Sequence, residues 1–190
     1  MTSHSIQDIY SLLAGSDARN NMIVKDVIAS VQAKRFPVLL TERRDHLDLL
    51  VGMLTPHIRN VIVMRGGLGK KQRRQLADKI AGLPYDQPRV IIATGRYLGE
   101  GYDDDRLDTL FLALPISWRG TLTQYAGRLH RGNATKKEVI IYDYVDFEVP
   151  VLTRMHVRRK AGYKSIGYSI ESSYPNLKPD QLALETRSDL

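Results

Sequence analysis

A short segment, residues 121–131 (TLTQYAGRLHR), holds the residues of this chain that are best suited to chemistry. At 100° per residue of a helix, Gln124, Arg128 and Arg131 fall in one narrow stripe, and Gly127 lies beside that stripe. No acidic residue stands three or four positions from either arginine. Two guanidinium groups without a local carboxylate are arranged to bind an external anion. Such arginines can stabilise the charge of a γ-phosphate while it is transferred.

A purely structural interpretation of the same segment stays open. Thr121 and Gln124 fit a capping box, in which the Gln124 side chain only bonds to the start of the helix. Arg128 and Arg131 would then form a solvated helix face. The opposite face is apolar and is expected to bury against a sheet, and it consists of Leu122, Tyr125, Ala126 and Leu129.

A glycine-rich segment, residues 93–105 (ATGRYLGEGYDDD), comes earlier in the chain. Its glycines, Gly95 and Gly101 among them, permit positive φ angles and a close approach of the backbone to a ligand. Exposed backbone N–H groups and Arg96 suit a phosphate, and Asp103 suits a ribose hydroxyl or a cationic partner. A glycine-rich turn with a solvated acidic patch is the alternative interpretation.

Five short apolar runs are expected to position these residues. They are rich in Val, Ile and Leu and hardly alternate with polar residues, which is typical of strands covered on both faces. Helical stretches at 44–54 and 71–80 lie between them, so the sequence predicts an α/β fold with a largely parallel sheet. In such a sheet, ligands bind beyond the carboxyl ends of the strands. The predicted strands are 38–41, 61–64, 90–94, 109–114 and 139–144.

The ends of the chain frame this predicted sheet. Residues 1–35 are expected to form a helical lead-in, and 148–160 a closing helix. We expect the main domain to cover 36–168, and 169–190 to be a polar tail or the stub of a linker. The sequence contains neither a run of 18 apolar residues nor a signal-peptide pattern, which predicts a cytoplasmic protein that does not cross a membrane.

Composition narrows the classes of function. Cysteine is absent, which excludes disulfides and metal centres held by cysteine. The five histidines are scattered without a His-x-x-x-His pair, so we expect no dedicated metal site. The 28 Lys and Arg residues exceed the 21 Asp and Glu residues and give a formal charge of +7. This excess favours a polyanionic partner such as nucleic acid, although ordinary surface solvation is the alternative.

The glycine-rich and arginine-bearing segments, in this order, resemble motifs V and VI of superfamily 2 helicases. QYAGRLHR matches the motif VI pattern Gln-x-x-Gly-Arg-x-x-Arg completely, and VIIATGRYLGEGYD resembles motif V. VLLTERRDHLDLL resembles motif IV, and VMRGGLGKKQRR resembles the glycine turn and basic helix that follow it. Over about residues 20–168, the chain is thus similar to the C-terminal RecA-like lobe of DEAD/DEAH-type helicases associated with restriction or mobile elements.

The resemblance implies a role for each matching position. Arg128 and Arg131 would be arginine fingers that reach ATP across a cleft, and Gln124 would sense its γ-phosphate or the opposite lobe. Residues expected to line the nucleotide side of the cleft are Gly101, Asp103 and Gly127. Residues expected to hold the phosphodiester backbone of one strand are Thr41, Arg43, Gly66, Gly67, Thr94, Gly95 and Arg96.

Two motifs needed for ATP hydrolysis are missing from the sequence. Near Gly69 and Lys70, Met64 replaces the first glycine of a Walker A motif, and Lys71 replaces the Ser or Thr that would bind Mg²⁺. No Asp-Glu-x-His or Asp-Glu-Ala-Asp box occurs either. We therefore expect ATP and Mg²⁺ to be held by an N-terminal RecA-like lobe, in cis or in trans. The chain would then be a fragment or a separate subunit, without ATPase activity of its own.

Three functions are compatible with these patterns. The first is a lobe of an ATP-dependent helicase or translocase that contacts nucleic acid, with DNA favoured over RNA. The second is a non-enzymatic nucleic-acid-binding module with a degenerate nucleotide face, against which the intact Gln124, Arg128 and Arg131 argue. The third is a self-sufficient small NTPase or a dinucleotide-binding enzyme. The lack of a Walker A motif, and of Gly-x-Gly-x-x-Gly after a first strand, argues against it.

Overall fold

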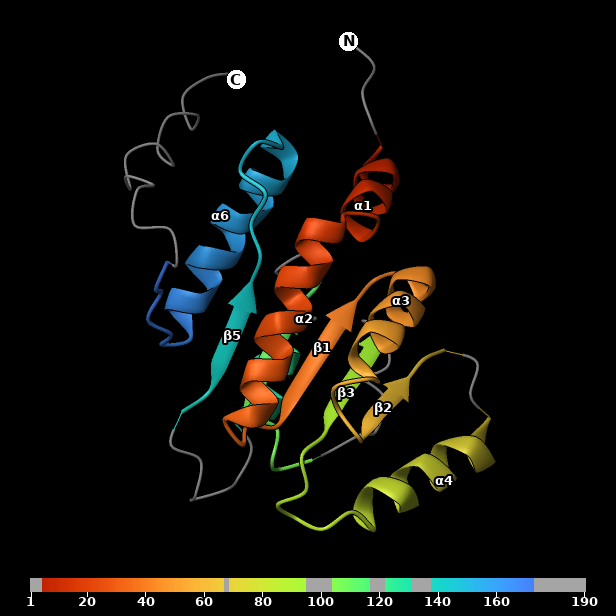
Figure 1. Ribbon diagram of the computed structural model, residues 1–190. Helices are drawn as coiled ribbons and strands as arrows, with labels where there is room; N and C mark the ends of the chain where they lie inside the picture. Colours follow the sequence, from red (N-terminus) through yellow and green to blue (C-terminus); the bar gives the residue numbers. More distant parts are fainter. Residues whose placement is uncertain (1–4, 67–68, 95–103, 117–121, 131–137, 173–190) are drawn as a thin grey trace. The chain divides into compact units, whose positions relative to one another are not determined.

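The computed structural model describes residues 5–66, 69–94, 104–116, 122–130 and 138–172 (Figure 1). The chain divides into two compact units, residues 1–144 and 145–190. The division falls inside the range 36–168 that the sequence suggests as one domain. No helix in the described ranges is long and apolar enough to cross a membrane.

A parallel five-stranded sheet forms the centre of the first unit, in the order β2-β3-β1-β4-β5. Neighbouring Leu39 and Leu40 point to opposite faces of the sheet, and both are 0% exposed. The sheet is therefore covered on both faces, and the predicted α/β fold with a parallel sheet is confirmed. The strands are β1 (Pro37–Thr41), β2 (Val61–Met64), β3 (Val90–Thr94), β4 (Thr109–Leu112) and β5 (Ile140–Asp143).

Helices flank the sheet in the first unit, and one long helix lies in the second. The predicted lead-in consists of two helices because Ser5 and Ser16 each cap a helix start with their side chains. The second and third helices pack on one side of the sheet, where their apolar faces form the core with β1 and β3 (Figure 1). The helices are α1 (Ile6–Ala14), α2 (Asp17–Gln32), α3 (Arg44–Leu54), α4 (Lys70–Ala81), α5 (Thr123–Leu129) and α6 (Pro150–Ser165).

Several predicted boundaries differ from the structure, some of them by a single residue. The strand expected at 109–114 ends at Leu112. The closing helix expected at 148–160 runs from Pro150 to Ser165. Its start follows from Pro150, whose fixed φ and missing N–H suit the first turn of a helix. It ends before Gly167, whose φ of +89° lies in the left-handed region that glycine adopts without strain.

Candidate functional site

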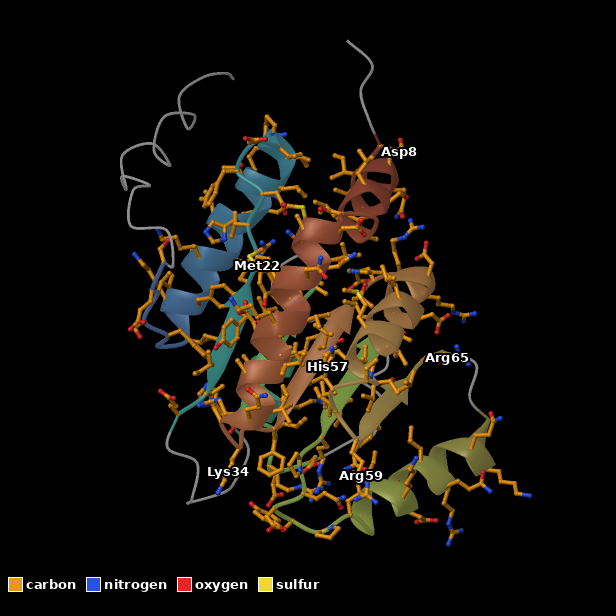
Figure 2. All side chains as sticks on the ribbon, in the orientation of Figure 1. Asp8, Met22, Lys34, His57, Arg59 and Arg65 are labelled. Atoms are coloured by element: carbon orange, nitrogen blue, oxygen red, sulfur yellow. The ribbon has the colours of Figure 1, made fainter. Side chains whose placement is uncertain are left out.

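All five strands end at the same edge of the sheet, because they run in one direction. In Figure 2, Arg65 lies at this carboxyl edge, whereas Lys34 and Arg59 lie at the opposite edge. Thr41 and Thr94 end the neighbouring strands β1 and β3 and are paired in the register. The structure therefore brings two of the predicted nucleic-acid residues side by side.

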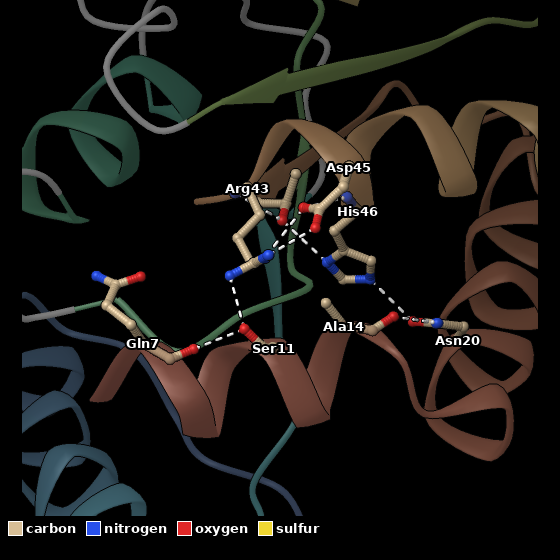
Figure 3. A network of polar contacts seen from close by, with 8 residues as sticks. Gln7, Ser11, Ala14, Asn20, Arg43, Asp45 and His46 are labelled. Atoms are coloured by element: carbon tan, nitrogen blue, oxygen red, sulfur yellow. Dashed lines mark hydrogen bonds and ion pairs between the residues drawn. The ribbon is translucent and has the colours of Figure 1, made fainter. Parts of the chain in front are cut away.

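The hydroxyl of Thr41 lies inside the protein, with the residue 0% exposed. Its Oγ1 lies 2.9 Å from Nδ1 of His46, and the backbone N–H of Arg43 donates to the same oxygen at 3.4 Å. The other ring nitrogen of His46 lies 2.9 Å from Oδ1 of Asn20, whose amide donates to the carbonyl of Ala14 at 2.8 Å (Figure 3). The Thr41 side chain thus stabilises the end of β1 from the interior of the protein, and its buried hydroxyl is not accessible to a phosphodiester.

This network and the burial of the ring together determine the tautomer and the charge of His46. Because Asn20 uses its amide N–H₂ on Ala14, its Oδ1 faces the ring and accepts the proton on Nε2. The Nδ1 atom then accepts the hydroxyl proton of Thr41. Burial of the ring, followed by the positive charge of Arg19, lowers the pKa of His46 to about 4. The imidazole is therefore neutral at pH 7.

The half-buried side chain of Arg43 has partners from two elements. It forms an ion pair with Asp45 at 2.6 Å and donates to the hydroxyl of Ser11 in α1 at 2.8 Å. Ser11 in turn donates to the carbonyl of Gln7 at 2.9 Å (Figure 3). The hydrogen bond from Arg43 lowers the pKa of Asp45, and the same bond raises the pKa of Arg43. A phosphate that binds Arg43 must therefore compete with Asp45.

Side chains that the sequence analysis missed join α1 and α2 to the carboxyl edge. The buried guanidinium of Arg19 donates to the carbonyl of Ala113 at 3.2 Å and to that of Tyr144 at 3.3 Å. The hydroxyl of Tyr10 donates to the carbonyl of Pro115. These carbonyls follow β4 and β5, so the two helices hold the ends of these strands as well as the end of β1.

The sequence did contain a signal for these contacts. Arg19 and Asn20 precede the core residue Ile23 by four and three positions, so they share its helix face. A polar side chain on such a face requires a buried partner. Their positions could therefore have marked them as bonding residues, although nothing in the sequence names the partners.

Helix α5 has the two faces that the helical spacing predicts. Gln124 and Gly127 are exposed, and Arg128 is half-exposed. A Cβ atom placed on Gly127 would meet no atom of the described residues within 4 Å, so packing against that part of the chain does not require glycine there. The apolar face is buried and consists of Leu122, Tyr125, Ala126 and Leu129.

Tyr125 connects α5 electrostatically to the end of β1. Burial raises the pKa of Tyr125 to about 12, the carboxylate of Glu42 also raises it, and the guanidinium of Arg128 lowers it. The Tyr125 hydroxyl is thus within electrostatic reach of Arg128 in the same helix and of Glu42, which follows β1. Helix α5 therefore lies near the end of β1.

The remaining predicted site residues divide into two groups. Gly66 follows β2 at the same edge, and its carbonyl accepts a hydrogen bond from Arg44 at 3.5 Å. Thr94 is half-buried. The other predicted residues lie outside the described residues, and these are Gly67, Gly95, Arg96, Gly101, Asp103 and Arg131.

Comparison with solved structures identifies the fold. The structure is similar to the T4 protein UvsW, with a TM-score of 0.68 and 16% identity over 86% of this chain and 36% of UvsW. It is similar to the C-terminal domain of the DEAD-box protein Dbp5, with a TM-score of 0.61 and 17% identity over 82% of each chain. Domain 2 of the DEAD-box helicase Mss116p, solved bound to an RNA duplex, gives a TM-score of 0.51 at 12% identity over 74% of this chain and 56% of that one. The chain thus has the α/β RecA-like fold that these structures share, and it spans about a third of the length of UvsW.

Comparison of sequences adds one relative. The uncharacterized protein 108L of Invertebrate iridescent virus 3 is 34% identical over 87 residues, which are 45% of this chain and 79% of the viral protein. No protein-family profile matches the chain. The chain belongs to the same family as this viral protein.

Proposed function

We propose that this chain is the C-terminal lobe of an ATP-dependent nucleic-acid helicase or translocase. In this proposal, Arg128 and Arg131 are arginine fingers for ATP that is bound on a separate N-terminal lobe. The observation that carries the proposal is the orientation of α5. Its buried side chains, Tyr125 and Leu129 among them, fix the helix near the end of β1, and Gln124 on the other face is exposed.

The outward face of α5 suits a phosphate presented by another lobe. The guanidinium of Arg128 would stabilise the negative charge that develops on the γ-phosphate. Gln124, one turn earlier, would contact the same phosphate or the opposite lobe. The open space around Gly127 would let that lobe approach the helix. ATP and Mg²⁺ would be held mainly by the other lobe, whose lysine and carboxylates this sequence lacks.

Nucleic acid is proposed to bind at the carboxyl edge of the sheet, with DNA favoured over RNA by the resemblance of the sequence. Thr94 and Gly66 lie there, and Arg43 follows β1. Since the Thr41 hydroxyl is buried, a contact at this position would come from the backbone. The residues proposed to complete this surface are Gly67, Gly95 and Arg96.

The decisive experiment replaces the proposed fingers in a protein that contains both lobes. A finger contributes about 10³–10⁵ in rate, so Arg128→Ala and Arg131→Ala should each lower kcat by several orders of magnitude, equivalent to about 4–7 kcal/mol of barrier. The melting temperature should hardly change, because a surface substitution alters stability by less than about 0.5 kcal/mol. Arg59→Ala, at the opposite edge of the sheet, is the matched control. Wild-type kcat in both finger variants would overturn the proposal.

A further inference from the structure

The second compact unit contains a helix, α6, that is rich in cations. α6 carries five Lys and Arg residues and no Asp or Glu. Arg159 is buried, at 1% exposed. The side chains of the other four make no hydrogen bond or ion pair with any residue that the structure describes, and these are Arg154, Arg158, Lys160 and Lys164.

The four cations flank the outward face of α6. At 100° per residue, Arg154 and Arg158 lie together on one side of this face, and Lys160 and Lys164 lie together on the other. Val157 separates the two pairs. The distance along the helix axis from the first cation to the last is about 15 Å, at 1.5 Å per residue. The buried side of the helix consists of Leu152, Arg159, Gly162 and Tyr163.

We propose that this face of α6 binds the sugar–phosphate backbone of nucleic acid as a second surface, carried by the second unit and independent of ATP. One strand of duplex DNA presents a phosphate about every 3.4 Å along the axis, so a row of about 15 Å can face several successive phosphates. Cations without local carboxylates keep their full charge available for this purpose. No base contact is implied, so binding should not depend on nucleotide sequence.

A lipid surface fits α6 less well. A helix that lies in a membrane interface needs an exposed apolar face beside its cations. In α6, Leu152 and Tyr163 are buried, and Val157 is the one large apolar residue of this helix that is exposed, at 38%. The cations of α6 therefore lack the apolar anchor that insertion between headgroups requires.

The test uses the full chain and a fluorescent single-stranded oligothymidine, titrated at several salt concentrations. Each phosphate contact contributes about 0.7 to the slope of log K against log salt for single strands. Removing two contacts should thus lower the magnitude of this slope by about 1.4. If the plots of log K against log salt for the variant and the wild type meet at 1 M salt, the variant binds about 25-fold more weakly at 0.1 M salt. The variants are Arg154→Gln with Arg158→Gln, and separately Lys160→Gln with Lys164→Gln.

The matched control removes two charges elsewhere. Lys25 in α2 and Arg59 are exposed residues of the first unit, and replacing both by Gln changes the net charge by the same amount. If this control loses as much affinity as the α6 variants, the bulk charge of +7 explains binding and the α6 surface is wrong. Thermal melts followed by circular dichroism check folding, and if one α6 pair misfolds the other pair decides the question.

Two further outcomes separate this surface from the alternatives. Binding of the wild-type chain to phosphatidylserine vesicles, lost in the α6 variants while oligonucleotide binding persists, would assign the surface to lipid and overturn the proposal. Binding of nucleic acid by α6 and the proposed helicase function have only the class of partner, nucleic acid, in common. Wild-type kcat in both Arg128→Ala and Arg131→Ala would therefore reject the finger role and leave the α6 measurement unaffected.

Discussion

His46 Nε2 and Asn20 Oδ1 lie 2.9 Å apart inside the protein, and this contact joins the end of β1 to helix α2. With the bond of the same ring to Thr41, it holds the strand end from which Glu42 and Arg43 leave the sheet. In the neutral ring, with its proton on Nε2, Nε2 donates to Asn20 and Nδ1 accepts from Thr41, and protonation of Nδ1 would reverse the second bond. The protonation of one buried ring thus governs the support of the proposed nucleic-acid edge.

Stability should decrease as the pH falls through the range set by His46. The folded pKa, about 4, lies below the ordinary value of 6.5, so the unfolded chain takes up the proton first. The stabilisation is complete above about pH 6.5 and is lost as the pH falls toward 4, by about 3 kcal/mol in total. Urea unfolding of the wild type and of His46→Gln at pH 7 and pH 4 would measure this loss. The difference in the free energy of unfolding between the two proteins should be smaller at pH 4 than at pH 7.

A control for this prediction is His57→Gln, because the side chain of His57 is exposed. It should keep the pH dependence of the wild type. If His46→Gln shows the same pH dependence of stability as the wild type, His46 is not the group responsible for it. At pH 7, His46→Gln should itself destabilise the protein by about 1–3 kcal/mol, since Thr41 and Asn20 lose well-placed partners.

Asp45→Asn should strengthen the binding of nucleic acid. The carboxylate holds Arg43 in an ion pair of 2.6 Å, and its removal frees the guanidinium for one more phosphate. The salt slope for a single strand should then rise by about 0.7. Asp86→Asn makes the same change in charge at an exposed residue that precedes β3. Equal gains in both variants would show that net charge, and not Arg43, is responsible.

Gly127→Ala should separate stability from activity. Its Cβ would meet no atom within 4 Å, so alanine should stabilise α5 by about 0.5–1 kcal/mol. In a protein with both lobes, the added methyl group should nevertheless lower kcat, because the proposed partner lobe approaches at this point. Gly52→Ala in α3, which has the same open surroundings, should give the stability gain alone. An unchanged kcat in both variants would show that α5 faces solvent.

The chain by itself should not hydrolyse ATP. It lacks the lysine loop and the carboxylates that hold Mg²⁺ in such enzymes. Phosphate release should stay at background with saturating single-stranded DNA or RNA. Turnover on the common enzyme scale of ~1–10³ s⁻¹, abolished by substituting a residue of this chain, would place an ATP site within it.

The sequence by itself determined the type of fold and the two faces of α5. Strands such as β1 and β3 are covered on both sides, and this burial selects the unbroken apolar runs from which they were predicted. The helical period likewise separates the buried Tyr125 and Leu129 from the exposed Gln124. Both features depend on neighbours within a few residues, which a sequence displays directly.

Only the tertiary structure decided what the polar side chains at the carboxyl edge do. Arg19 bonds to a carbonyl 94 positions away in the sequence, and no local pattern encodes such a partner. Thr41 was expected to face a phosphodiester, but helices α2 and α3 bring Asn20 and His46 to this point and bury its hydroxyl. The strand order β2-β3-β1-β4-β5 decides which loops become neighbours. The role of a polar residue therefore depends on what the folded chain packs against it.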